Sequence, residues 1–359
     1  MRAAVTGANG LIGANLVRAL LRGRARVVAL VRATSRLDSL AALPIEIAHG
    51  DVRDSQGLAE AFEGCDVLFH TAAHFAYRGH TADELETTAV AGTRNVLDAA
   101  ARARVRRVVL TSSSVVLGSS PTPTVRTEAA SLDASQDEPA YVLAKAKQEQ
   151  TAFAHAAELG LDLIAVCPTM SIGPHAISLG PSNAIVTTYL GDPLRITYPG
   201  GCNIVAVDDV ARGHILAAES GVPGERYVLG SENLEWSAIH AMIGELAGVG
   251  GPFLHANHAG SYVAALSEEV MAWMGSRAPK TTRTQAKMVG RYYWYSHAKA
   301  AGLGYAPQPA RRALAEAIAW LSGSPHISRE TRAGLQLSRE VYDARRALAQ
   351  CESQLVSAP

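Results

Sequence analysis

Residues 1–13 read MRAAVTGANGLIG, an apolar run followed by three glycines within seven residues. The run at 2–6 has the length and composition of a buried β-strand, and helical periodicity begins at Leu11. Glycines at such a junction allow a tight turn, close approach of the backbone to a pyrophosphate, and close packing of helix on strand. The helix N-terminus then offers amide donors and a positive dipole end to phosphates. This context predicts a dinucleotide site formed by Gly7, Asn9, Gly10, Leu11, Ile12 and Gly13.

The same strand-turn-helix pattern repeats through the first 170 residues. Apolar runs predict strands at 2–6, 26–31, 45–48, 66–70, 106–111 and 162–167, and helical periodicity predicts helices at 11–22, 55–63, 83–103 and 139–159. Short apolar strands that alternate with helices form a parallel sheet covered on both faces. Right-handed crossovers make such a sheet doubly wound, with ligands at the carboxyl ends of its strands. We therefore predict an α/β fold with a Rossmann doubly wound parallel sheet.

The pattern changes after about residue 170, where Pro, Gly and Tyr become more frequent. We predict a dinucleotide-binding domain over 1–170, with strand and helix contributions from 204–230, and a smaller mixed substrate-binding lobe over 171–322. A helical C-terminal extension is expected over 323–359, with one helix at 328–350. That helix either packs on the surface or acts in an oligomer or as a lid.

Composition excludes several classes of protein. The chain has 359 residues, 48% of them hydrophobic and 18% charged, as in globular rather than disordered proteins. Its 33 basic and 33 acidic side chains balance, which argues against a nucleic-acid or anionic-membrane partner. No apolar run is long enough to span a membrane, and the first run is broken by glycines and asparagines, so we expect a cytoplasmic protein. The cysteines and histidines lack ligand spacing, and no metal site is expected.

The end of the second predicted strand indicates which dinucleotide binds. An acidic residue there would accept a hydrogen bond from the ribose 2′-hydroxyl of NAD, whereas Arg suits a 2′-phosphate. Arg32 stands at this point, Arg36 follows one turn later, and the first carboxylate is Asp38. Guanidinium groups bind phosphate bidentately, so we predict NADP (NADPH), with NAD as the alternative. Asp51, which precedes Val52 after the third strand, either accepts from the adenine amino group or only forms a turn.

Tyr141 and Lys145 stand four residues apart in the helix predicted at 139–159, so they share one face. A Tyr hydroxyl can give its proton to a carbonyl oxygen while hydride reaches the carbon, provided that a neighbouring ammonium lowers its pKa from about 10. The serine-rich stretch 111–114 ends the fifth strand at the same sheet edge, where Ser113 would hold the substrate oxygen. We predict Ser113, Tyr141 and Lys145 as the catalytic set.

Further motifs occur in order: FHTAA (69–73), GTRNVLDAA (92–100), TSSSVVLG (111–118), YVLAK (141–145), CPTMSIGP (167–174), IVAVDDVARGH (204–214) and LGYAP (303–307). With TGANGLIG at 6–13, they make residues 1–322 resemble the extended short-chain dehydrogenases/reductases of the NAD-dependent epimerase/dehydratase superfamily. Within it the chain is similar to the dihydroflavonol 4-reductase-like group. The resemblance implies cofactor contacts for Thr71, Ala72, Ala73, Val52, Pro168, Thr169 and Tyr141, and contacts of Lys145 with the nicotinamide ribose.

Departures from that family bear on the reaction. Sugar-nucleotide dehydratases of this superfamily carry a Thr-Asp-Glu triplet at the position where this chain has serines 112–114. The absence of this acid pair argues against 4,6-dehydration. Asn203 stands where nucleotide-sugar enzymes usually present an Arg to a diphosphate, although Arg195 could replace it. We therefore predict an NADPH-dependent reductase that acts on a ketone or aldehyde of a moderately apolar small metabolite. The alternative is an NAD(P)-dependent sugar or sugar-nucleotide epimerase.

Residues after the strand ends could line the substrate pocket or only pack there. They are His74, Phe75, Tyr77, Val115, Met170 and His175; the Tyr-Trp-rich segment 288–295 could likewise add a lid or only pack. Extended members of the family often dimerise, but monomers also occur, so a homodimer stays open.

Overall fold

Seven parallel strands form the large sheet of the protein. The computed structural model describes residues 1–54, 57–72, 82–132, 138–257 and 289–357, with the single residues 260, 266, 267 and 271. The strand order is β10-β6-β5-β4-β1-β2-β3. In chain order the strands are β1 (Arg2–Thr6), β2 (Arg26–Val31), β3 (Glu46–His49), β4 (Val67–His70), β5 (Arg107–Thr111), β6 (Asp162–Pro168) and β10 (Arg226–Leu229). The order reverses between β1 and β4, and ligands of doubly wound sheets bind at such a point.

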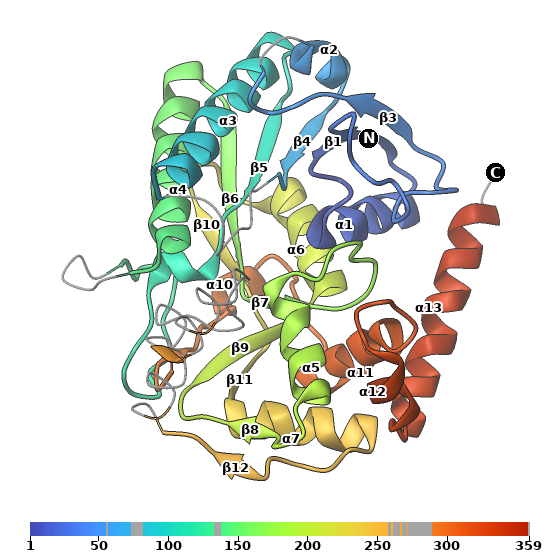
Figure 1. Cartoon of the computed structure of the whole chain (residues 1–359). Helices are drawn as coiled ribbons and strands as arrows, with labels where there is room; N and C mark the ends of the chain where they lie inside the picture. Colours follow the sequence, from blue (N-terminus) through green and yellow to red (C-terminus); the bar gives the residue numbers. More distant parts are fainter. Residues whose placement is uncertain are drawn as a thin grey trace.

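Helices cover both faces of this sheet (Figure 1). Helices α1 (Leu11–Arg22) and α6 (Val207–Ser220) pack together on one face. The other face carries α2 (Leu58–Phe62), α3 (Ala82–Arg102) and α4 (Ala140–Leu159). A strand such as β2 is buried beyond its first residue, because its apolar side chains meet a helix layer on each side. The predicted Rossmann sheet is confirmed, and the predicted bounds of its elements agree within a few residues.

A smaller mixed sheet lies below the large one in Figure 1. Strand β9 (Gly201–Ala206) pairs with β7 (Met170–Ile172), β11 (Glu232–Glu235) and β13 (Tyr292–Tyr293). A short pair, β8 (Ile196–Thr197) and β12 (Leu254–His255), lies at the far end of this lobe. Around them stand α5 (Pro181–Gly191), α7 (Trp236–Ala247) and α11 (Ala310–Leu321). The short α10 (Ala298–Ala301) packs against β10 of the large sheet, and the 3-10 helix η1 (Ser114–Leu117) contacts α4.

The segment considered as a lid is part of this lobe's core. Within its described residues, β13 pairs with β9, and Tyr295 is 2% exposed. The Tyr295 hydroxyl donates to the carbonyl oxygen of Gly118 at 2.9 Å. Of the two roles considered for this part, the structure shows packing, because strand pairing and burial hold the segment in place.

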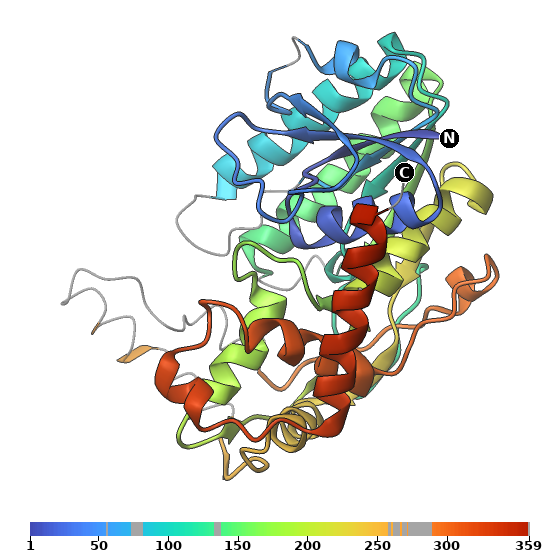
Figure 2. The ribbon, with the colours of Figure 1, turned by 90° about the vertical axis from the view of Figure 1, so that its right-hand side faces the viewer.

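The helix expected at 328–350 is two helices, α12 (Arg329–Ala333) and α13 (Arg339–Ser357). The break has a tertiary cause: the amides of Gln336 and Ser338 donate to carbonyl oxygens at the end of α7, each at 2.9 Å. Helix α13 then runs from the smaller lobe to α1 (Figure 2). Its Val341 is buried in the core of the smaller lobe, and its Leu355 in the core beside α1. The last helix therefore joins the two parts of the molecule.

No helix in the described part of the chain combines the length and the apolar character needed to cross a membrane.

Candidate active site

A cleft of about 550 Å³ opens at the carboxyl ends of β1 and β4, where the strand order reverses. Its described lining comes from the turn after β1, the ends of β2 and β3, the end of β4, and the facing sides of α3 and α4. The residues include Gly7, Asn9, Gly10, Leu11, Arg32, Arg36, Asp51, Val52, Thr71, Ala72, Tyr141 and Lys145. Twelve residues predicted from the sequence are thus brought into one cavity.

The turn after β1 packs tightly against neighbouring backbone because Gly7 and Gly13 lack side chains. Gly7 has a φ of +66°, and a Cβ added there would lie 2.7 Å from the Cα of Ala72. A Cβ on Gly13 would lie 2.2 Å from the carbonyl oxygen of Gly7. Helix α1 begins after Gly10, which provides no side-chain cap. The first amides of the helix therefore face a cradle that fits the pyrophosphate of a dinucleotide.

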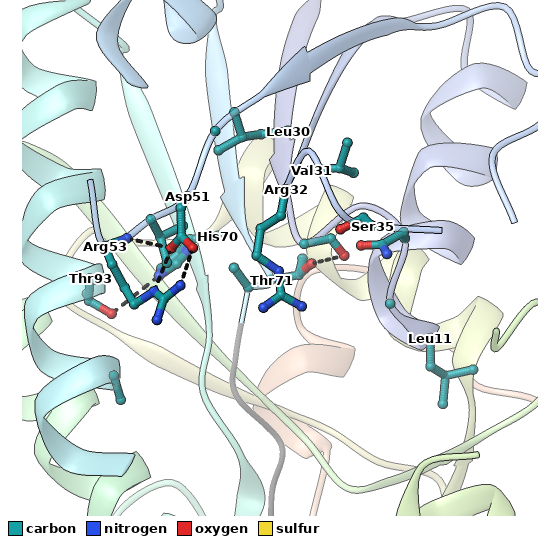
Figure 3. A pocket seen from close by; sticks show the side chains of 18 of the residues that line it. Leu11, Leu30, Val31, Arg32, Ser35, Asp51, Arg53, His70, Thr71 and Thr93 are labelled. Carbon is teal, nitrogen blue, oxygen red and sulfur yellow. Dashed lines mark hydrogen bonds and ion pairs between the residues drawn. The ribbon is translucent and has the colours of Figure 1, made fainter. Parts of the chain in front are cut away.

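The opposite end of the cleft is basic. Figure 3 shows the Arg32 side chain extending into the cleft between the Asp51–Arg53 pair and Ser35. Arg36 lies nearby, and its guanidinium donates to Asp38 at 3.0 Å. This hydrogen bond holds the pKa of the Asp38 carboxyl below its usual value. The carboxylate of Asp38 is thus occupied by an arginine.

Asp51 forms the turn that was one of its two expected roles. Its Oδ1 accepts from the Arg53 amide at 2.9 Å, and its Oδ2 accepts from Nη2 of the same arginine at 2.6 Å. These contacts lower the pKa of Asp51 to about 2. Contact with an adenine amino group stays a prediction. Arg53 itself lines the cleft and was missed in the sequence, although a basic residue two positions after Asp51 was a visible signal.

Helix α4 brings Tyr141 and Lys145 to the cleft. The helix begins after Pro139, and both side chains are 5% exposed. Ser113 lies before η1, where its Oγ accepts from the Val115 amide at 3.5 Å, and it is half-buried. Ser113 does not line the cleft as the described residues outline it. The structure thus brings Tyr141 and Lys145 together in the cleft and places Ser113 outside its described lining.

The Lys145 ammonium is held by two acceptors. It donates to the carbonyl oxygen of Thr111 at 3.0 Å and to Oε1 of Gln148 at 2.9 Å. Burial lowers the pKa of Lys145 to about 8, and the carboxylate of Glu149 opposes that shift. An ammonium so placed favours the phenolate of a neighbouring tyrosine.

His70 and Thr93 are further cleft residues that sequence reasoning missed. Nδ1 of His70 lies 2.8 Å from Oγ1 of Thr6, and Nε2 lies 3.3 Å from Oγ1 of Thr93. Burial, reinforced by the charge of Lys145, lowers the pKa of His70 to about 3, so the ring is neutral near pH 7. Gln148 was missed too, although its position three residues after Lys145 placed it on the same helix face.

Other predicted cofactor residues lie around the cleft without lining its described surface. Ile12 and Gly13 belong to the first turn of α1, and Pro168 ends β6. Thr169 is buried, and its hydroxyl donates to Oδ1 of Asn203 at 2.8 Å. Ala73 lies outside the described residues, as do His74, Phe75 and Tyr77.

The remaining pocket candidates have packing partners. Val115 is half-buried in η1. The thiol of Cys202 donates to the sulfur of Met170 at 3.7 Å. The ring of His175 packs against that of Trp320 with centroids 4.8 Å apart. None of these three candidates lines the cleft outlined by the described residues.

A Rossmann sheet with a glycine turn and a Tyr-Lys helix at one cleft defines the extended short-chain dehydrogenase/reductase class. The chain belongs to the NAD-dependent epimerase/dehydratase family, whose pattern matches residues 3–230. Members are oxidoreductases and epimerases that use a nicotinamide cofactor.

Two curated relatives and one solved structure are similar along most of their length. A Synechocystis sp. protein provisionally named dihydroflavonol 4-reductase is 35% identical over 90% of this chain and 95% of its own. Cinnamoyl-CoA reductase 1 of Oryza sativa subsp. japonica is 31% identical over 90% of this chain and 91% of its own. The crystal structure of gox2253 is 34% identical, with a TM-score of 0.80, and covers 91% of this chain and 99% of that chain.

Proposed function

We propose that the protein is an NADPH-dependent reductase that transfers hydride to the ketone or aldehyde carbon of a moderately apolar small metabolite. The observation that carries the proposal is one cleft that holds the glycine cradle, the basic end at Arg32, and the Tyr141–Lys145 pair. The reductase names of the two similar curated relatives support it.

The proposed roles follow from the side chains. NADPH, held over the Gly7 turn, supplies the hydride. Tyr141 gives its hydroxyl proton to the carbonyl oxygen, so that the carbonyl becomes an alcohol. Lys145, charged and buried, stabilises the phenolate that Tyr141 becomes as its proton leaves, and it holds the nicotinamide ribose. Ser113 donates a hydrogen bond to the substrate oxygen.

The preference for NADPH rests on the arginines at the end of the cleft. Arg32, Arg36 and Arg53 all line it, and both nearby carboxylates, Asp38 and Asp51, are taken up by arginines. A 2′-phosphate would therefore meet the Arg32 guanidinium at the end of β2, whereas the 2′-hydroxyl of NAD would find an arginine where its carboxylate acceptor usually stands.

Asn203 and Arg195, the two residues considered for binding a sugar-nucleotide diphosphate, do not line the cleft as the described residues outline it. Asn203 is 1% exposed, and its side chain bonds to Thr169, Ser231 and Asn233. Arg195 precedes β8, and its carbonyl oxygen accepts from Phe253 before β12, at the far end of the smaller lobe. These placements support reduction over nucleotide-sugar epimerisation.

The test is a titration of purified protein with NADPH and, separately, with NADH, followed by nicotinamide fluorescence after a check for copurified cofactor. We expect exchangeable binding that favours NADPH, and NADPH oxidation with members of a panel of aryl and alkyl ketones and aldehydes. Retained NAD that survives dialysis, with turnover of sugar nucleotides only, would instead establish the epimerase. A reductase drawing on NADPH fits the cytoplasmic location expected from the sequence.

A further inference from the structure

A buried chain of hydrogen bonds leads from Lys145 to the residue before the glycine turn. Lys145 donates to Oε1 of Gln148 at 2.9 Å, and Nε2 of Gln148 donates to Oγ1 of Thr93 at 2.8 Å. Oγ1 of Thr93 lies 3.3 Å from Nε2 of His70, and Nδ1 of His70 lies 2.8 Å from Oγ1 of Thr6. All five side chains are at most 5% exposed.

The direction of the bonds at the Lys145 end of the chain is determined by the groups themselves. An ammonium can only donate, so the amide oxygen of Gln148 faces Lys145 and the amide nitrogen faces Thr93. Thr93 therefore uses one acceptor site for Gln148. Because His70 is neutral, the chain adds no second positive charge beside Lys145. Every contact between two of these groups satisfies a polar atom that would otherwise be buried unpaired.

We propose that Gln148 is a positioning residue that holds the Lys145 ammonium for the reaction, and that Thr93 and His70 hold Gln148 in turn. The inference deepens the proposed reductase function and rests on it for the role of Lys145. An ammonium has three N–H groups; Thr111 and Gln148 accept two of them inside the protein. Within the described part of the chain Lys145 donates no other hydrogen bond, so the third N–H is assigned to the cleft, where the cofactor ribose and Tyr141 belong.

Besides Tyr141 in the cleft, three other titratable groups face Lys145 and stay unchanged when Gln148 is replaced. Glu149 lies on the same helix and is paired with Arg226 at 2.9 Å. Cys167 comes from β6, and burial keeps its pKa well above the usual value. His70 comes from β4. A change at Gln148 therefore alters one hydrogen bond to the ammonium and leaves the surrounding charges as they are.

Two substitutions at Gln148 should shift the pKa of Lys145 in opposite directions. Gln148→Met keeps the length of the side chain but removes the acceptor, which destabilises the charged ammonium and lowers the pKa of Lys145 by about one unit. Gln148→Glu adds a negative charge and raises it by a similar amount. The matched control is Gln150→Met, because Gln150 is exposed on the same helix.

The first readout does not use substrate. Each protein is treated with a limiting amine-reactive reagent across a pH series, and Lys145 is followed by mass spectrometry with exposed Lys147 as internal reference. At pH 7 we expect labelling of Lys145 to be roughly fivefold faster than wild type in Gln148→Met and roughly tenfold slower in Gln148→Glu, from the change in the neutral fraction. The Gln150→Met protein should match wild type. Thr93→Val should resemble Gln148→Met with a smaller shift.

The second readout is the pH profile of kcat for carbonyl reduction, whose alkaline limb should shift in the same two directions. If Gln148 positions Lys145, the alkaline limb shifts in opposite directions in the two variants. A general loss of packing would instead lower kcat in both variants without such opposite shifts. Equal labelling midpoints in wild type, Gln148→Met and Gln148→Glu would overturn the inference. Failure of wild type to reduce any carbonyl compound would overturn the proposed function alone, since the labelling result is independent of turnover.

Discussion

Nε2 of His175 lies 3.3 Å from a carboxylate oxygen of Glu352, a residue on the last helix, α13. The same carboxylate pairs with Arg18 on α1, whose side chain is 9% exposed. Two and three residues after His175, Ile177 and Ser178 line the cofactor cleft. The C-terminal helix thus anchors the segment that borders the cofactor site.

Glu352→Ala should destabilise the protein. It leaves the Arg18 guanidinium buried without its carboxylate, which we expect to lower the free energy of unfolding by about 2 kcal/mol, because Glu352 is partly exposed. Urea unfolding followed by circular dichroism measures the change. The control is Gln354→Ala, at an exposed position on the same helix. Equal unfolding free energies for the two variants would show that the Arg18 contact contributes nothing.

Gly7→Ala should abolish NADPH binding. Its Cβ would lie 2.7 Å from the Cα of Ala72, so the turn must move. Gly160→Ala is a matched control, because Gly160 has the same φ of +66° with nothing within 4 Å of an added Cβ. The control should cost only about 1 kcal/mol of stability and keep NADPH affinity. Fluorescence titration with NADPH measures the affinity of both variants. Normal NADPH affinity in Gly7→Ala would argue against a pyrophosphate at this turn.

Arg32→Asp should shift preference from NADPH toward NADH. The substitution removes a guanidinium from the 2′-phosphate position and supplies an acceptor for a 2′-hydroxyl. We expect the ratio of the two dissociation constants to change by at least about tenfold, or 1.4 kcal/mol. Arg26→Asp, at the exposed start of the same strand, should leave the ratio unchanged. An unaltered ratio in Arg32→Asp would mean that another residue binds the phosphate.

Lys145→Met should change the pH dependence of stability as well as abolish turnover. The Lys145 pKa is lowered from 10.5 to about 8 in the folded protein. Between these values the unfolded chain binds more protons than the folded one, so this lysine makes wild type more stable as pH rises. Relative to Lys145→Met, wild type should gain about 3 kcal/mol between pH 7 and pH 10.5. A constant difference across this range would contradict the buried, shifted ammonium.

The Rossmann sheet could be predicted because its signals are local. The valine-rich run of β2 predicts a buried strand, and the glycines from Gly7 to Gly13 predict a tight turn. Each signal lies within the few residues that form the element. Parallel pairing then brings Gly7, Ala72 and Tyr141 to one edge, as the order of the strands requires. This is why twelve predicted residues line the same cleft.

The C-terminal helices show why other predictions failed. Nothing in the residues at 334–338 forbids a helix outright, yet Gln336 and Ser338 give their amides to α7 instead. Likewise, the sequence left the aromatic segment ending at Tyr295 open between a lid and packing, and only its pairing with β9 and its burial distinguish the two. In both cases the competing partner is far away in the sequence.

By itself, then, the sequence determined the doubly wound sheet, the glycine cradle and the Tyr141–Lys145 pair, because apolar periodicity and short-range spacing dictate which faces are buried. Only the tertiary structure decided what holds Lys145. Gln148 is hydrogen-bonded to Thr93, which lies 55 residues away in the sequence, and His70 to Thr6, which lies 64 residues away. Such partners depend on which strands and helices become neighbours, and a buried polar group bonds to whatever the packed elements place beside it.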